Sequence, residues 1–234
     1  MDASIVAALC SRAGQMAPAE LRALRHVLGV AISGLDAEHS LPTDPRKLAA
    51  IRAIQDSLFH LTNYPGHIPD DGMMWTGRPA FVTDAVLAAL QCRARAESVN
   101  KIRSGKHFFV ECPAMLELLP PGALASFLQA LEGGLQPRGK ANLQYYEAPG
   151  ECIGAHVDVD DFGLSGVMLL RHEHQQPRAS RLWVFPRGQA PKVVELEPGH
   201  MVIFCGQAVI HQRTAVAAGE QVTTLAINIS ASRE

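Results

Sequence analysis

The chain has 234 residues, of which 47% are hydrophobic and 19% are charged, so it can bury the core of one domain. Its formal net charge of −2 does not suggest the clustered basic face that binds nucleic acid. The five cysteines are scattered and odd in number, which favours buried free thiols in a reducing cytoplasm. With no export signal at its start and no apolar stretch long enough for a bilayer, the chain is expected to be cytoplasmic, without a membrane partner.

The first hundred residues are predicted to be mainly helical. Apolar residues recur at helical spacing over residues 17–34, 44–60 and 83–97, with helix-starting residues near the beginning of each stretch. The segment 63–79 is rich in proline and glycine, which predicts a surface loop that acts as a lid or contacts substrate. We therefore expect residues 1–100 to be a helical part of the same domain as the rest of the chain.

Residues 101–234 are predicted to be the strand-rich core of that domain. β-favouring residues begin at His107, and short strands with glycine and proline turns follow a helix over residues 122–131. Such a series indicates a jelly-roll or barrel. Because no linker separates the two halves, we expect an α+β fold with the N-terminal helices packed on one face. Strands after residue 131 are predicted over residues 142–147, 152–156, 165–173, 180–185, 193–196, 201–204, 209–214 and 222–230.

Two histidines and one aspartate have the composition of a metal site. His156 and Asp158 lie two residues apart at the end of a predicted strand, so an extended backbone places both side chains on one face. His211 lies in an apolar predicted strand, where a buried imidazole needs a polar partner. Two imidazoles and a carboxylate form the facial triad of non-heme iron(II) enzymes, which leaves metal positions open for a co-substrate and dioxygen. Taken alone, each histidine is also explained as a hydrogen-bonded core residue.

The surrounding motifs favour a single site. The run Gln144-Tyr-Tyr-Glu-Ala-Pro-Gly150 precedes His156, and the turn Pro198-Gly199 with an apolar strand precedes His211. In this order of motifs, residues 142–230 resemble the iron(II)- and 2-oxoglutarate-dependent dioxygenase superfamily, especially its prolyl-hydroxylase-like and AlkB-like branches. The resemblance implies a double-stranded β-helix in which the two histidines and the aspartate hold catalytic iron(II). It also implies that dioxygen converts 2-oxoglutarate to succinate and CO2 while a second substrate is hydroxylated.

The chain departs from this family at the residue that binds the far carboxylate of 2-oxoglutarate. Where the family has a basic residue, Gly219-Glu-Gln221 places a glutamine. Gln221 can hydrogen-bond to a carboxylate but cannot form the charge-assisted contact of an arginine. Arg213 is the leading replacement because it lies two residues beyond His211 on the same predicted face, although it would be a rim residue if paired with Glu220 or another nearby carboxylate. The other candidates are Arg181, Arg171, Lys101 and Arg103.

Aromatic and polar residues near the expected site are candidates for its walls. Adjacent residues on a strand face opposite ways, so only one of Tyr145 and Tyr146 can line the co-substrate pocket. Asn142 and Asn228 are candidate polar liners of that pocket, or else ordinary structural residues. Trp183 is expected in the core or in the wall of the substrate site.

A second metal pattern and two other functions remain as alternatives. His172 and His174 could bind zinc or copper, but the polar residues after them favour a solvated turn, and the same reasoning applies to His107. A cupin-like iron enzyme could use the same ligands without 2-oxoglutarate, and Gln221 keeps this alternative open. A non-catalytic ligand-binding jelly-roll would not need the three ligands to converge. Because the composition is not basic, we expect a small molecule or an amino-acid residue as substrate rather than nucleic acid.

Overall fold

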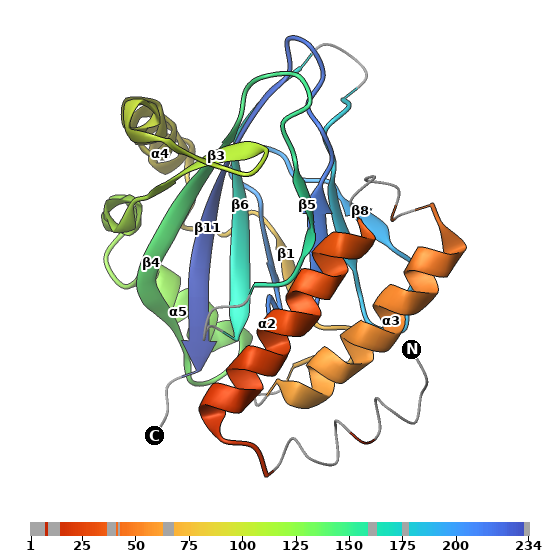
Figure 1. Cartoon of the computed structure of the whole chain (residues 1–234). Helices are drawn as coiled ribbons and strands as arrows, with labels where there is room; N and C mark the ends of the chain where they lie inside the picture. The colour runs from red at the N-terminus through yellow and green to blue at the C-terminus, as the bar shows by residue number, and fades with distance from the viewer. Residues whose placement is uncertain are drawn as a thin grey trace.

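Two antiparallel sheets form the core of the computed structural model, which describes residues 8, 15–36, 41, 43–62, 68–158, 163–174 and 178–231. Together they confirm the jelly-roll prediction, and helices flank them on the outside (Figure 1). In spatial order, the large sheet contains β1 (Met73–Gly77), β9 (Met201–Phe204), β6 (Leu164–Glu173), β11 (Gln221–Ala231), β4 (Leu135–Tyr146), β3 (His107–Glu111) and β2 (Ile102–Ser104). The small sheet contains β5 (Ile153–His156), β10 (Ile210–Arg213), β7 (Leu182–Phe185) and β8 (Lys192–Val194).

The helices begin at the capping residues that the sequence provides. Oδ1 of Asp44 accepts hydrogen bonds from the backbone N–H groups of Arg46 and Lys47, and Oγ1 of Thr83 accepts one from Val86. Among the described residues, no helix is long and apolar enough to cross a membrane. The helices with defined bounds are α2 (Pro18–Leu35), α3 (Pro45–Leu61), α4 (Asp84–Glu97) and α5 (Ala123–Leu131), with short 3-10 helices η1 (Ser98–Asn100) and η2 (Pro113–Leu118).

These helices are divided between the two sheets. Oγ of Ser33 on α2 donates to the carbonyl of Ala155 in β5 at 3.3 Å, and α3 is tied to the end of β7 through Gln55. On α4, Nε2 of Gln91 donates to a β6 carbonyl at 2.7 Å. Figure 1 shows α2 and α3 beside β5 and β8, while α4 lies near β3 and β4. Helices thus cover the outer sides of the domain and leave the space between the sheets to strand residues.

The two faces of the large sheet differ in polarity. Leu143 and Leu225 are register partners and fully buried, on the face where the hydroxyl of Tyr145 donates to the carbonyl of Ala94 in α4 at 2.7 Å. The opposite face, toward the small sheet, carries polar residues such as Gln144. Alternation along the strands separates an apolar core from a polar interior. Of the described cysteines, none forms a disulfide; Cys112, Cys152 and Cys205 are buried as expected, Cys92 is exposed, and Cys10 lies outside the described residues.

One predicted loop contains a strand. Part of the segment 63–79 forms β1, which pairs with β9 at the edge of the large sheet. Gly72, with a φ of 79°, turns the chain into this strand, and its N–H donates to the carbonyl of Pro69 at 2.7 Å. Residues 63–67 of the expected lid lie outside the described part of the chain. The first hundred residues therefore contribute a strand to the large sheet as well as helices.

Candidate metal centre

His156 and His211 face each other across two paired strands. They are register partners in β5 and β10, and the centres of their rings lie 4.1 Å apart. Asp158 follows β5, and its Oδ1 lies 3.9 Å from Nε2 of His156 and 3.7 Å from Nε2 of His211. Candidate ligand atoms of the three residues all lie within 4.8 Å of one another. The structure thus brings the three predicted ligands together.

The backbone orients both imidazoles with Nε2 toward that point. Nδ1 of His156 lies 2.8 Å from the carbonyl oxygen of Gly154, and Nδ1 of His211 lies 3.1 Å from that of Val209. A carbonyl oxygen only accepts hydrogen bonds, so each Nδ1 carries the proton that it donates and Nε2 is the ring atom left to bind a metal. Burial, followed by the effect of His156, lowers the pKa of His211 to about 4, so this ring is neutral at pH 7. Metal-binding histidines are oriented in this way by an acceptor behind the ring.

Asp158 is held in place by Ser165 and Gly206. The backbone N–H of Asp158 donates to the carbonyl of Gly206 at 2.8 Å, and Oγ of Ser165 donates to Oδ2 of the aspartate. Oδ1 therefore remains directed at the two imidazoles. A Cβ atom at position 206 would overlap Oγ of Ser165 and lie 2.5 Å from Oδ2 of Asp158. The absence of a side chain at Gly206 makes room for the carboxylate.

Gly206→Ala is expected to weaken binding of a divalent metal by roughly 10–100-fold, the usual cost of disturbing a group that orients a ligand. The added methyl group displaces Asp158 or Ser165, whereas the fold retains both histidines. Calorimetric titration with Mn²⁺ measures the affinity. The matched control is Gly133→Ala, because a Cβ atom at Gly133 meets nothing within 4 Å. Equal affinities for the two variants would contradict this role of Gly206.

The three residues lie in the wall of a cavity of about 250 Å³. Of the two adjacent tyrosines, Tyr146 lines this cavity, whereas Tyr145 faces α4 on the other side of the sheet. Asn142 and Asn228, the two candidate polar liners, both lie in the wall. The interior is thus a chamber with polar and apolar walls that opens onto the candidate metal ligands. Ser165, Gln144 and Thr224 add further polar groups to it.

Arg213 supplies a positive charge to this cavity. It lies on the same face of β10 as His211, lines the cavity and is only 5% exposed. Among the described residues, no carboxylate lies within ion-pair distance of its guanidinium, whose hydrogen bond to Oγ of Ser180 is long at 3.5 Å. The guanidinium also lies 5.7 Å from the ring centre of Tyr146. Burial lowers the pKa of Arg213, yet an arginine stays charged in a protein. A buried cation beside a cavity provides a site for an anionic ligand.

The other candidate cations lie outside this cavity and have partners of their own. Arg181 and Arg171 form surface ion pairs, with Glu195 and with Glu173 respectively. Lys101 pairs with Glu147, and Nε of Arg103 donates to a carbonyl in its own hairpin. Of the five cations that the sequence offers for a carboxylate, Arg213 is therefore the one that lines the cavity.

Gln221 and Trp183 do not line the cavity. In β11, Val222 and Thr224 are register partners of Tyr146 and Gln144, both of which face the cavity. Gln221 is one residue away from Val222, so its side chain faces the opposite side of the sheet. Contrary to the expectation for a co-substrate contact, Gln221 therefore lies outside the cavity, whereas Tyr146 is the one tyrosine of the adjacent pair in its wall. Trp183 packs partly buried against the hydrophobic core.

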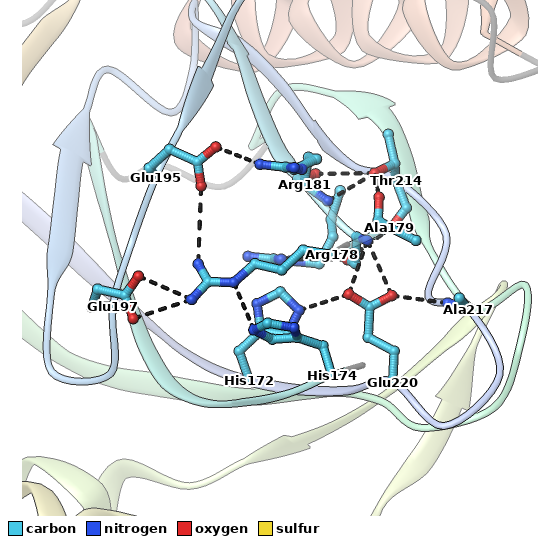
Figure 2. Close-up of polar contacts among 12 residues, drawn as sticks. His172, His174, Arg178, Ala179, Arg181, Glu195, Glu197, Thr214, Ala217 and Glu220 are labelled. Carbon is cyan, nitrogen blue, oxygen red and sulfur yellow. Dashed lines mark hydrogen bonds and ion pairs between the residues drawn. The ribbon is translucent and has the colours of Figure 1, made fainter. Parts of the chain in front are cut away.

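Beside Arg213, a buried carboxylate joins three segments of the chain. Figure 2 shows Glu220 between His172, Ala217 and the backbone near Ala179. Its oxygens accept hydrogen bonds from Nε2 of His172 at 2.7 Å, from the N–H of Ala217 at 2.9 Å and from the N–H of Ser180 at 3.0 Å. Burial raises the pKa of Glu220, but these hydrogen bonds outweigh it and lower the pKa overall. The carboxylate fixes Ser180, which contacts Arg213.

The two histidines of the second candidate metal pattern, His172 and His174, are bonded to other side chains of the protein. The side chain of His172 is 4% exposed and bonded to Glu220, so the prediction of a solvated turn is wrong for this residue. Nε2 of His174 accepts a hydrogen bond from Nε of Arg178 at 2.9 Å, as Figure 2 shows. Both histidines thus have protein partners at Nε2 and belong to a polar network behind the cavity.

Glu220→Gln is expected to lower the free energy of unfolding by about 2 kcal/mol, because it weakens hydrogen bonds to a buried charged group. The lowered pKa of Glu220 means that its stabilising effect is complete above the ordinary glutamate pKa and is lost as pH falls through the folded-state value. Urea unfolding at neutral and acidic pH should therefore show a difference from the parent that shrinks in acid. Glu195→Gln, which removes an exposed carboxylate, should cost under about 1 kcal/mol. A larger loss of unfolding free energy in Glu195→Gln than in Glu220→Gln would contradict the stabilising role of Glu220.

Three solved structures with the same fold have low sequence identity to the chain. The non-heme α-ketoglutarate-dependent epimerase SnoN from nogalamycin biosynthesis has a TM-score of 0.56 at 16% identity, covering 80% of this chain and 84% of SnoN. EctD from S. alaskensis, solved with 2-oxoglutarate and 5-hydroxyectoine, has a TM-score of 0.54 at 17% identity, covering 81% and 77%. A Pseudomonas putida prolyl-4-hydroxylase has a TM-score of 0.50 at 17% identity, covering 78% and 100%. No protein-family model matches the chain, and no curated protein matches it significantly.

These matches confirm the fold that the resemblance to the dioxygenase superfamily implied. The fold and the convergent side chains define a jelly-roll protein with a candidate metal site made of two histidines and an aspartate. Sequence reasoning missed Ser165 and Gly206 beside that site. A serine in the apolar run from Leu164 to Leu170 was a usable signal for the first. The role of Gly206 depends on a close approach between two distant segments, for which the sequence has no signal.

Proposed function

We propose that the chain is an iron(II)- and 2-oxoglutarate-dependent dioxygenase that hydroxylates a small molecule or an amino-acid residue. The observation that carries this proposal is one cavity with the three convergent ligands and, two residues beyond His211, the buried guanidinium of Arg213. Residues two apart on an extended strand are separated by roughly 6.6 Å. This spacing suits a short dicarboxylate with one end at the metal and the other at the arginine.

The chain's own residues would bind and position the reactants. His156 and His211 would hold iron through Nε2 and Asp158 through its carboxylate, and three ligands leave other metal positions open. Arg213 would hold the far carboxylate of 2-oxoglutarate through charge-assisted hydrogen bonds, with its guanidinium placed by Tyr146 and Ser180. When bound, iron(II) supplies the oxidation in which dioxygen converts 2-oxoglutarate to succinate and CO2 while a C–H bond of the second substrate becomes C–OH.

Two other functions receive less support. A non-catalytic ligand-binding jelly-roll does not require three metal-binding side chains with their Nε2 and Oδ1 atoms directed at one point. A cupin-like iron enzyme without 2-oxoglutarate does not require a buried arginine beside the metal ligands, with no carboxylate of the described residues within ion-pair distance. Both features instead suit a metal that is used together with a dicarboxylate.

Succinate formation tests the proposal. Incubation with iron(II), 2-oxoglutarate and dioxygen is expected to give succinate slowly even without a second substrate, and His156→Ala should remove this turnover. Absence of both succinate formation and 2-oxoglutarate binding would contradict the proposal. Once a second substrate is found, the mass of its product separates hydroxylation, which adds one oxygen atom, from epimerisation, which adds none.

A further inference from the structure

A groove of about 470 Å³ adjoins the candidate metal site. It lies between α2 and the β2–β3 hairpin, both of which Figure 1 shows near β5. Ile153 and His156 line both this groove and the cavity of the candidate metal site. A molecule in the groove would therefore lie next to a metal held by His156, while the co-substrate occupies the cavity.

His107 in the wall of this groove lacks a hydrogen-bond partner. It is 8% exposed, and among the described residues neither of its ring nitrogens is hydrogen-bonded. Its ring stacks on that of Tyr146, with the ring centres 5.6 Å apart and the planes at 22°. Neither ring nitrogen is fully enclosed by the protein, so each is open to a ligand in the groove. A neutral imidazole there can donate a hydrogen bond through one nitrogen and accept one through the other.

Two charged residues, Lys106 and Asp36, are among the described residues that line the groove. Asp36 is 2% exposed, and its two oxygens accept hydrogen bonds from the backbone N–H groups of Leu41 and Ala155. Both carboxylate oxygens of Asp36 are therefore used in hydrogen bonds within the protein. The backbone of Lys106 is anchored by the N–H of Cys152 at 3.0 Å, which holds the lysine next to His107.

We propose that this groove binds the molecule that the iron centre oxidises, and that this molecule is a small polar compound with a carboxylate held by Lys106 and His107. The inference rests on the proposed function, because the groove adjoins the metal only through His156. A carboxylate accepts hydrogen bonds from both an ammonium and an imidazole N–H, and contacts to charged groups are the stronger ones. Ser33 and Ser104 offer further polar contacts in the same wall.

A carboxylate probe tests the ligand class without turnover. The intact metal-free chain is titrated at constant pH with acetate and, as the neutral match, with acetamide, while the ring signal of His107 is followed by NMR. This signal is assigned by its loss in His107→Gln. Acetate is expected to shift it saturably and acetamide is not. Lys106→Met should weaken acetate binding about tenfold or more, because it removes a charge-assisted hydrogen bond. Lys192→Met, which removes a lysine outside this groove, should leave the response unchanged.

Two outcomes would overturn the anion site: an equal response to acetamide, or an acetate response that is lost in Arg213→Met and retained in Lys106→Met. A third titration, with Mn²⁺ in the metal site, links the groove to the metal, since bound acetate should then show a broadened methyl signal that Lys106→Met reduces. Broadening that Lys106→Met leaves unchanged would place acetate elsewhere and overturn the proposal. Binding of Mn²⁺ is checked separately by EPR against His156→Ala, so failure of the metal site is distinguishable from failure of the groove.

Discussion

Replacing His211 with alanine is expected to abolish tight binding of iron(II), with a loss of affinity of at least about 100-fold. The variant removes one of three ligands, and disturbing a neighbouring group alone costs about 10–100-fold. His211 is buried and neutral at pH 7, with Nε2 directed at Asp158 and Nδ1 hydrogen-bonded to Val209. Anaerobic titration with iron(II), followed by calorimetry, measures the affinity of each variant.

His200→Ala is the matched control for this experiment. His200 uses its backbone to join the turn before β9, through hydrogen bonds with Glu197 and Leu169. Its removal should leave the affinity for iron(II) unchanged, and circular dichroism should show both variants folded. Wild-type affinity in a folded His211→Ala variant would contradict the ligand assignment, as would an equal loss in the control.

Arg213→Met is expected to weaken binding of 2-oxoglutarate to the iron-loaded protein by about 100-fold, equivalent to about 3 kcal/mol for the lost charge-assisted contacts. Binding of iron(II) should be retained, because the three ligands are untouched. Methionine fills a similar volume, and replacing a buried charge with an apolar side chain is often neutral for stability. Arg213→Lys should recover part of the affinity, since a lysine keeps the charge but loses the bidentate geometry.

Arg181→Met and Arg171→Met are the controls for Arg213. Arg171 lies in β6 and Arg181 next to β7, and both form surface ion pairs outside the cavity. Their loss should leave the affinity for 2-oxoglutarate unchanged. If either control lost the affinity while Arg213→Met kept it, the co-substrate carboxylate would bind elsewhere.

The three candidate metal ligands could be selected from the sequence because their signal is local. His156 and Asp158 are two residues apart, and the strand bearing His211 is recognisable from its apolar run. By contrast, the choice between Tyr145 and Tyr146 required the register of β4 against its neighbours, which a sequence does not contain. The outward direction of Gln221 follows from the same register.

Local turn signals misplaced some element boundaries. β4 begins at Leu135, before the predicted start at residue 142, because Pro137 and Gly139 indicate a turn although the paired backbone continues past them. β1 was missed since a short edge strand has one neighbour and a weak pattern of its own. His107 was assigned to a solvated position, yet its ring is buried against Tyr146, a contact between residues far apart in the chain.

The most direct test of the account is an anaerobic titration of 2-oxoglutarate into the iron(II)-loaded protein, followed by visible absorption. Chelation of iron(II) by a 2-oxo acid produces a charge-transfer band, so the band reports the metal and the co-substrate in one site. The account predicts a saturable band that is absent in His211→Ala and requires far more 2-oxoglutarate in Arg213→Met. A protein that binds iron(II) but gives no band, or a band that Arg213→Met leaves unchanged, would contradict it.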